Sequence, residues 1–177
     1  MADLILLTGP PGAGKSTIAH ELLARFYTIV IVSGDALYGF IARGAILPWE
    51  PEATRQNETC TGAAGAACGY YAQGGYTVVF DGMVGPWFLP TFLAATGLAR
   101  LAYIVLMPPA DVCVHRVTSR VGHGFSDVPA TRHMHAEFER AAPDARHVIT
   151  DVAEPDRTVD EIVTRLQAGL LHLEGGR

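Results

Sequence analysis

Lysine is almost missing from this sequence of 177 residues. Lys15 is the only lysine among the 13 lysine and arginine residues, which face 18 aspartate and glutamate residues. A formal net charge of −5 leaves no excess of positive charge for a general nucleic-acid surface. No apolar run reaches the roughly 18 residues of a membrane helix. We therefore expect neither nucleic acid nor a membrane among the partners.

Cysteine is also scarce. The three residues Cys60, Cys68 and Cys113 are odd in number and lack the paired spacing of a zinc site. Free thiols in a reducing compartment are the ordinary state of such cysteines. The apolar residues near the start have no basic leader and no small-residue cleavage site. The sequence therefore predicts a cytoplasmic protein that begins with a core strand.

What the sequence does contain is a complete phosphate-binding loop, or P-loop. Residues 9–17 read GPPGAGKST, which matches G-x-x-x-x-G-K-[ST] without a mismatch. Glycine lets successive backbone N–H groups turn towards an anion at a helix N-terminus. In this motif Lys15 reaches the β- and γ-phosphates and the Ser16 hydroxyl binds Mg²⁺. The predicted nucleotide-binding residues are Gly9, Gly12, Ala13, Gly14, Lys15, Ser16 and Thr17.

Strands and helices alternate along the rest of the chain, which predicts an α/β domain with a parallel sheet. Ligands of such sheets bind beyond the carboxyl ends of the strands. The predicted strands cover about residues 3–8, 28–32, 76–81, 101–107 and 147–150. The predicted helices cover about residues 18–26, 35–42, 51–73, 86–95, 110–120, 130–141 and 157–173.

Two aspartates follow predicted strands and are candidates for the site. Asp35 comes directly after the second strand, where a carboxylate can orient or deprotonate a substrate hydroxyl. Asp81 ends the run Val78-Val79-Phe80, which is similar to the strand that carries a Mg²⁺-binding aspartate in P-loop proteins. Either carboxylate could instead cap a helix or a strand end.

Two arginines lie four residues apart on the helix predicted over 110–120. Arg116 and Arg120 share one helical face and precede a glycine-containing loop over residues 121–129. Arginines that a closing lid brings to a transferring phosphoryl group stabilise its charge and exclude water. The alternative is a solvated face that pairs with Asp111 or Glu137.

A possible acceptor pocket lies between the second and third strands. Arg43 and Arg55 flank a Pro-Trp-Glu-Pro stretch and could hold an anionic group of a substrate. Nearby aromatic residues could form a wall beside them, or could be ordinary core and surface residues. These aromatic candidates are Tyr38, Phe40, Trp49, Trp87 and Phe88.

The order of these motifs resembles that of the small P-loop kinases. Within them, the segment from Arg116 to Phe125 and the later Glu137-Phe138-Glu139 are similar to the lid of gluconate kinases, and Gly34-Asp35 resembles their acidic substrate motif. The chain also looks like shikimate kinases, chloramphenicol phosphotransferases and tunicamycin-resistance P-loop proteins. The resemblance implies the nucleoside-monophosphate-kinase fold. That fold is a three-layer P-loop NTPase domain with a parallel sheet in the order 2-3-1-4-5 and a helical lid.

The resemblance also implies roles for individual residues. Asp35 contacts the acceptor hydroxyl as base or orienting group, and Arg120 with Arg116 covers the ATP phosphates. Arg55 holds an anionic group of the acceptor. The predicted catalytic residues are Lys15, Asp35, Arg116 and Arg120. The predicted acceptor-binding residues are Asp35, Tyr38, Arg43, Trp49, Arg55 and Asp81, and the predicted Mg²⁺ ligands are Ser16 and Asp81.

The leading hypothesis is therefore an ATP- and Mg²⁺-dependent kinase that phosphorylates a hydroxyl of a small molecule. The acceptor is a sugar acid, a cyclitol or a natural product such as an antibiotic. A nucleotide kinase and an ATP-binding resistance or regulatory protein with little turnover are the alternatives. We expect one domain over residues 1–177, a lid over about 116–138, and a monomer or homodimer.

Overall fold

The computed structural model describes residues 4–120 and 125–174. Its strands are β1 (Leu4–Thr8), β2 (Ile29–Ser33), β3 (Thr77–Asp81), β4 (Arg100–Leu106), β5 (Val148–Ile149) and β6 (His172–Glu174). Its α-helices are α1 (Lys15–Glu21), α2 (Gly34–Gly39), α3 (Thr54–Gln73), α4 (Leu89–Thr96), α5 (Ala110–Ser119), α6 (Val128–Ala141) and α7 (Pro155–Gln167). Short 3-10 turns cover Leu22–Arg25, Pro51–Ala53 and Ala145–His147.

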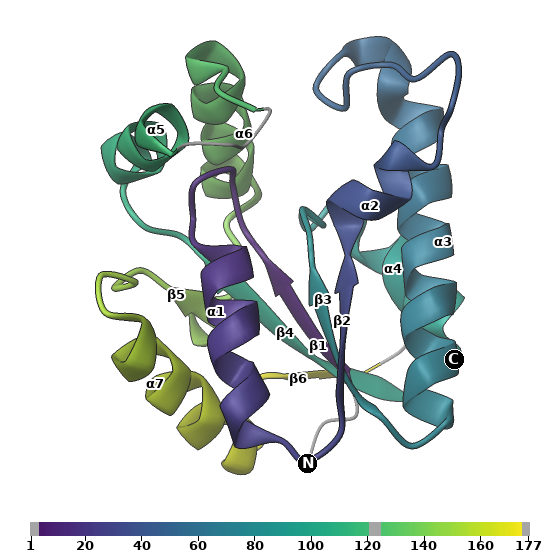
Figure 1. Ribbon diagram of the computed structural model, residues 1–177, viewed down its shortest axis with the longest axis vertical. Helices are drawn as coiled ribbons and strands as arrows, with labels where there is room; N and C mark the ends of the chain where they lie inside the picture. The colour runs from purple at the N-terminus through teal and green to yellow at the C-terminus, as the bar shows by residue number, and fades with distance from the viewer. Residues whose placement is uncertain (1–3, 121–124, 175–177) are drawn as a thin grey trace.

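Five parallel strands form the sheet in the order β2-β3-β1-β4-β5, which confirms the predicted topology. The register sets Asp81 of β3 beside both Leu7 of β1 and Ser33 of β2. The carboxyl ends of these three strands therefore reach the same edge of the sheet. The P-loop leaves this edge from β1, and α2 begins there directly after β2 (Figure 1).

A sixth strand corrects the prediction for the end of the chain. Residues 172–174 form β6, which pairs antiparallel with β4, so the helix predicted to reach residue 173 ends at Gln167. Gly169 has a φ of 71°, a left-handed conformation that stops the helix and turns the chain. Leu171, which has no exposed surface, then enters the core, and Leu173 pairs with Leu101. Residues that read as the last turn of an amphipathic helix are instead an edge strand.

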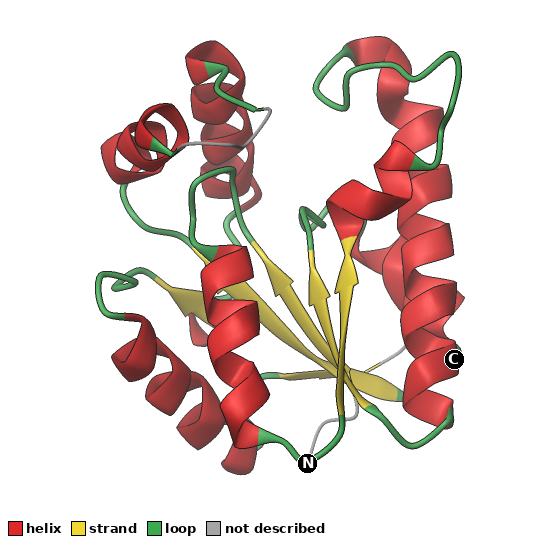
Figure 2. Cartoon of the chain, in the orientation of Figure 1, coloured by secondary structure: helices red, strands yellow, loops and turns green. Residues whose placement is uncertain are grey.

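Two helical layers cover the sheet, one on each face (Figures 1 and 2). Alternate residues of a strand point to opposite faces. Ile5 and Leu7 of β1 accordingly join the core under α1 and α7, whereas Leu4 and Leu6 join the core under α3 and α4. The sheet is therefore buried on both sides, as expected for parallel strands. None of the described helices has the length and apolarity that a membrane crossing requires.

Helices α3 and α4 pack so closely that two glycines of α3 have no room for a side chain. A Cβ on Gly69 would lie 2.0 Å from the Thr96 carbonyl oxygen, and one on Gly65 would lie 2.5 Å from the Phe92 carbonyl oxygen. A Cβ on Gly62, in the same helix, would have no neighbour within 4 Å. Because glycine lowers helix propensity, α3 depends on this packing for its stability.

These two environments predict opposite effects of the same substitution. Gly69→Ala should lower the free energy of unfolding by about 1–3 kcal/mol, because the new methyl group overlaps the backbone of α4. Gly62→Ala should raise it by about 0.5–1 kcal/mol, because alanine favours the helix and meets nothing. Urea unfolding of both variants measures the difference. Equal effects would show that α3 and α4 are not in close contact.

Candidate active site

The P-loop requires glycine at positions where the backbone both turns and touches its neighbours. Gly9 and Gly12 have φ values of 146° and 79°. A Cβ on Gly9 would lie 2.2 Å from the Leu106 carbonyl oxygen at the end of β4, and one on Gly12 would lie 2.3 Å from the Cys113 carbonyl oxygen of α5. Gly14, with φ of 101°, is the N-cap residue directly before α1. The loop thus presents backbone groups at its glycines, which fits a bound phosphate.

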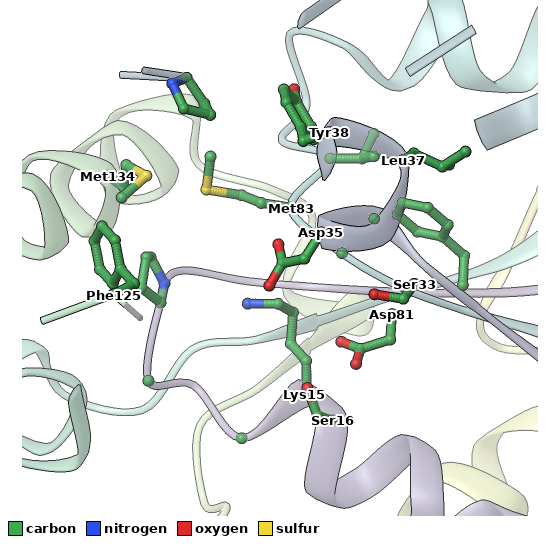
Figure 3. A pocket seen from close by; sticks show the side chains of 18 of the residues that line it. Lys15, Ser16, Ser33, Asp35, Leu37, Tyr38, Asp81, Met83, Phe125 and Met134 are labelled. Atoms are coloured by element: carbon green, nitrogen blue, oxygen red, sulfur yellow. The ribbon is translucent and has the colours of Figure 1, made fainter. Parts of the chain in front are cut away.

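Lys15 extends over this loop. Its Nζ donates hydrogen bonds to the carbonyl oxygens of Gly9 at 2.9 Å and Pro10 at 3.1 Å. Figure 3 shows the amino group pointing towards the Asp35 carboxylate, with Asp81 on the other side of the lysine stem. Burial lowers the pKa of the Lys15 ammonium, and the carboxylates of Asp81 and Asp35 act in the opposite direction. The ammonium therefore sits among oxygen atoms at the position where phosphates would enter.

Arg116 ties three segments of backbone together. One terminal nitrogen of its guanidinium contacts the carbonyl oxygens of Ala13 at 3.3 Å and Gly12 at 3.5 Å, and the other donates to the Val152 carbonyl oxygen at 2.9 Å. The side chain also lines the cavity over the P-loop. In this structure Arg116 holds the P-loop, α5 and the segment after β5 in one arrangement. Its predicted place beside the phosphates is compatible with that position.

Arg120 and Asp35 face the same cavity from opposite sides. Arg120 ends α5, and its guanidinium donates to the Phe125 carbonyl oxygen at 3.1 Å. Its Nε is buried and has no hydrogen-bond partner among the described residues. Burial lowers the pKa of the Arg120 guanidinium, and the Asp35 charge opposes this shift. Because the Arg120 side chain lines the cavity, its guanidinium is a charged donor suited to an incoming anion.

Ser16 and Asp81 provide oxygen atoms on the floor of the cavity. Ser16 is the second residue of α1, and Asp81 is the last residue of β3. Both line the cavity beside Lys15 (Figure 3). A hydroxyl and a carboxylate are the kinds of ligand that Mg²⁺ takes in proteins, together with phosphate oxygens. The pair fits the predicted Mg²⁺ ligands in chemistry and in position.

The cavity extends from the P-loop between α2, α3 and α6 and has a volume of about 680 Å³. Tyr38 and Trp49 line it, as predicted. The Tyr38 hydroxyl donates to Asn57 Oδ1 at 3.0 Å, and Asn57 Nδ2 donates to the Pro48 carbonyl oxygen at 2.7 Å. Burial raises the pKa of Tyr38. Trp49 meets the Phe125 ring edge-on, at 5.3 Å between centroids.

The two arginines predicted for the acceptor are not brought to this cavity. Arg43 is exposed in the loop between α2 and α3, and Arg55 is exposed in the first turn of α3. Successive residues of a helix are turned by about 100°. Arg55 therefore points roughly 200° away from Asn57, which marks the buried face. Phe40, with 76% of its surface exposed, and Trp87, which packs on Phe138, also lie outside the lining.

Several lining residues carry no motif that could have identified them. Met83 follows β3 and Met134 lies on α6, and both point into the cavity (Figure 3). Cys60 lines it from α3, next to Thr61. The spacing of Asn57, Cys60, Thr61 and Ala64 on one helical face was the available signal. The predicted lid residues 121–124 lie outside the described residues.

Comparison with known families decides the classification. Residues 4–145 match the family described as AAA domain, which spans the P-loop, Asp35, Asp81 and both arginines of α5. The chain belongs to this AAA domain family. A P-loop domain of this kind binds nucleotides. No curated protein matches the sequence significantly.

Solved structures with the same fold as this AAA domain include small-molecule kinases. An unliganded sugar kinase from Janibacter sp. HTCC2649 matches with a TM-score of 0.73 at 19% identity, over 94% of this chain and 95% of that one. The Deinococcus radiodurans tunicamycin resistance protein matches with a TM-score of 0.67 at 18% identity, over 100% of both chains. A shikimate kinase from Acinetobacter baumannii, solved with shikimate, matches with a TM-score of 0.55 at 17% identity, over 94% and 93%.

The contacts of Arg116 predict a structural effect that is separate from catalysis. Arg116→Gln should lower the free energy of unfolding of this AAA domain by about 1.5–3 kcal/mol without nucleotide, because carbonyl groups lose a charged donor. Arg132→Gln is the control, since Arg132 pairs with Asp111 at 2.9 Å on the surface and should matter by under about 1 kcal/mol. Urea unfolding compares the two. Similar values for both would show that the Arg116 tie contributes nothing to stability.

Proposed function

We propose that this protein is an ATP- and Mg²⁺-dependent phosphotransferase that phosphorylates a hydroxyl of a small molecule. One observation carries the proposal. Lys15, Arg120 and Asp35 line one cavity and lie near enough for their charges to interact, and the cavity also extends between α2, α3 and α6, which leaves space for a second molecule. A nucleotide-binding site without such a space would suit hydrolysis or switching. The fold likeness to a sugar kinase and a shikimate kinase supports the same class of reaction.

The phosphate end holds and orients the donor. The backbone N–H groups of the P-loop and the Lys15 ammonium bind the β- and γ-phosphates. Ser16 and Asp81 would hold Mg²⁺, which neutralises charge on the phosphate oxygens when it is bound. Arg120 donates from its guanidinium to the oxygens of the transferring group. Catalysis then rests on positioning and on charge stabilisation.

Asp35 acts on the acceptor. It stands in the first turn of α2, exposed to the cavity and facing Lys15 (Figure 3). As the acceptor oxygen bonds to the γ-phosphorus and the bond to the departing diphosphate breaks, the hydroxyl proton passes to the Asp35 carboxylate. The products are ADP and a phosphate ester. Asp35 thus orients the hydroxyl first and removes its proton afterwards.

A binding function without rapid turnover is the second candidate. The tunicamycin resistance protein matches this chain over the full length of both, so the two proteins share their fold from end to end. A resistance protein of this kind would bind ATP and a ligand with little turnover. Formation of ADP that depends on an acceptor separates the two candidates, because a kinase shows it and a binding protein does not.

The role of Asp35 predicts a loss of transfer with binding retained. Asp35→Asn should lower kcat by about 10²–10⁴-fold, because the amide cannot accept the proton. The Kd for ATP should stay within about 3-fold, a change smaller than 1 kcal/mol. Acceptor-dependent ADP formation and calorimetric ATP titration measure the two quantities.

A matched control tests whether any lost carboxylate would do the same. Glu52 is an exposed acid in the 3-10 turn before α3 and does not line the cavity. Glu52→Gln should leave kcat unchanged. Full activity of Asp35→Asn would remove Asp35 from the mechanism.

A further inference from the structure

The two ends of the cavity differ in charge. The charged side chains among its described lining residues are Lys15, Asp35, Asp81, Arg116 and Arg120. The three cations all belong to the phosphate end: Lys15 and Arg116 contact P-loop carbonyl groups, and Arg120 ends α5 opposite Asp35. Beyond Asp35 the described lining holds no cation. An acceptor that fills this space must therefore be bound without a positive partner of its own.

Most of the side chains that line the space beyond Asp35 are apolar or aromatic, and Thr61 adds one hydroxyl among them. Leu37 and Tyr38 of α2 line one side of this space, and Met83 and Met134 line the side opposite α2 (Figure 3). Trp49, whose ring packs on Phe125, and Phe80 also line the cavity. Met134 is 6% exposed and Phe80 is 2% exposed, so both belong to the core as well as to the cavity. We use the name apolar wall for Leu37, Tyr38, Trp49, Phe80, Met83 and Met134.

The Tyr38 hydroxyl of the apolar wall already has a partner. The Tyr38 hydroxyl proton goes to Asn57, and the Asn57 amide goes to the Pro48 carbonyl group. Asn57 itself is only 8% exposed. A polyol would place several hydroxyls against methionine, leucine and ring carbons, where they would lose their hydrogen bonds to water and gain few in return. A molecule with an apolar or aromatic body would lose nothing there.

Asp35 adds a second restriction. It supplies the negative charge at the entrance to the apolar wall, and the arginines that could have balanced an acceptor anion, Arg43 and Arg55, are exposed elsewhere. A carboxylate or phosphate on the acceptor would approach a like charge in a partly desolvated space. Like charges at such a position repel each other. An uncharged acceptor avoids this repulsion and leaves Asp35 free to take the hydroxyl proton.

We propose that the acceptor is an uncharged, largely apolar alcohol that carries an aromatic or similarly flat group, seated between Tyr38 on one side and the two methionines on the other and in contact with Trp49. Sugar acids and nucleoside monophosphates are excluded as preferred acceptors. This proposal rests on the proposed phosphotransferase function and narrows it. The size of the cavity, about 680 Å³ including the space for phosphates, limits the acceptor to a small molecule.

Acceptor-dependent ADP release tests the proposal. The full-length protein with Mg·ATP is assayed against two matched groups of compounds. The first holds nucleosides and uncharged aromatic natural products with a free hydroxyl. The second holds the corresponding nucleoside monophosphates, sugar acids and aromatic hydroxy acids. Lys15→Ala is the blank, and calorimetric ATP titration checks binding separately.

We expect at least one uncharged aromatic alcohol to stimulate ADP release more than about 10-fold over its anionic counterpart. One unfavourable charge contact accounts for a preference of this size. Preferential stimulation by the anionic group would overturn the proposal and leave the kinase function intact. ATP binding with no stimulation by any compound in either group would overturn the kinase function, and the proposal with it.

Variants of the apolar wall test the same point on the best acceptor found. Trp49→Ala should raise KM about 10-fold or more with kcat nearly unchanged, because the ring contributes binding area and takes no part in proton transfer. Trp49→Phe should restore most of the affinity. Phe40→Ala is the control, since Phe40 is 76% exposed and lies outside the cavity lining. Equal KM values for Trp49→Ala and Phe40→Ala would show that the acceptor does not touch the wall.

Discussion

The site depends on the lack of a side chain at two positions of the P-loop, Gly9 and Gly12. Gly9 and Gly12 bring the P-loop backbone against the end of β4 and against α5, at distances that any Cβ would violate. Arg116 then returns from α5 to the carbonyl groups of the same loop. The phosphate-binding loop and the first helix of the lid region are therefore placed by one set of contacts. A movement of α5 would therefore shift the loop, and a ligand bound in the loop would affect the position of α5.

Much of the fold could be predicted from residue pattern because parallel strands are buried on both faces. Continuous apolar runs marked β1 to β5, and the alternation with helices implied a parallel sheet. The antiparallel β6 could not be read in the same way. Its sequence continues the apolar spacing of α7, and the left-handed Gly169 that separates the two elements was the available signal. A local pattern could not show that β4 leaves an edge for residues 172–174 to cover.

The candidate site likewise has one part that residue patterns predict and another part that they do not. The P-loop has a sequence signature because its chemistry needs fixed residue types at fixed spacing, and Asp35 and Asp81 follow from strand ends. The apolar wall has no such signature, because methionine, leucine and cysteine are ordinary core residues until the topology opens a space beside them. The position of Arg55 in the chain suggests that it binds the acceptor. In the structure Arg55 lies on the exposed face of α3. A resemblance to kinases does not show which face of a helix a residue occupies.

The single lysine has a further consequence. Lys15 is the one ε-amine in the sequence, and it is held over the loop by two carbonyl oxygens with a lowered pKa. Acylating reagents that leave arginine untouched have this amine as their one side-chain target, and it lies inside the phosphate site. Because the sequence has no other lysine, acylation of side-chain amines would report whether a ligand fills the phosphate site.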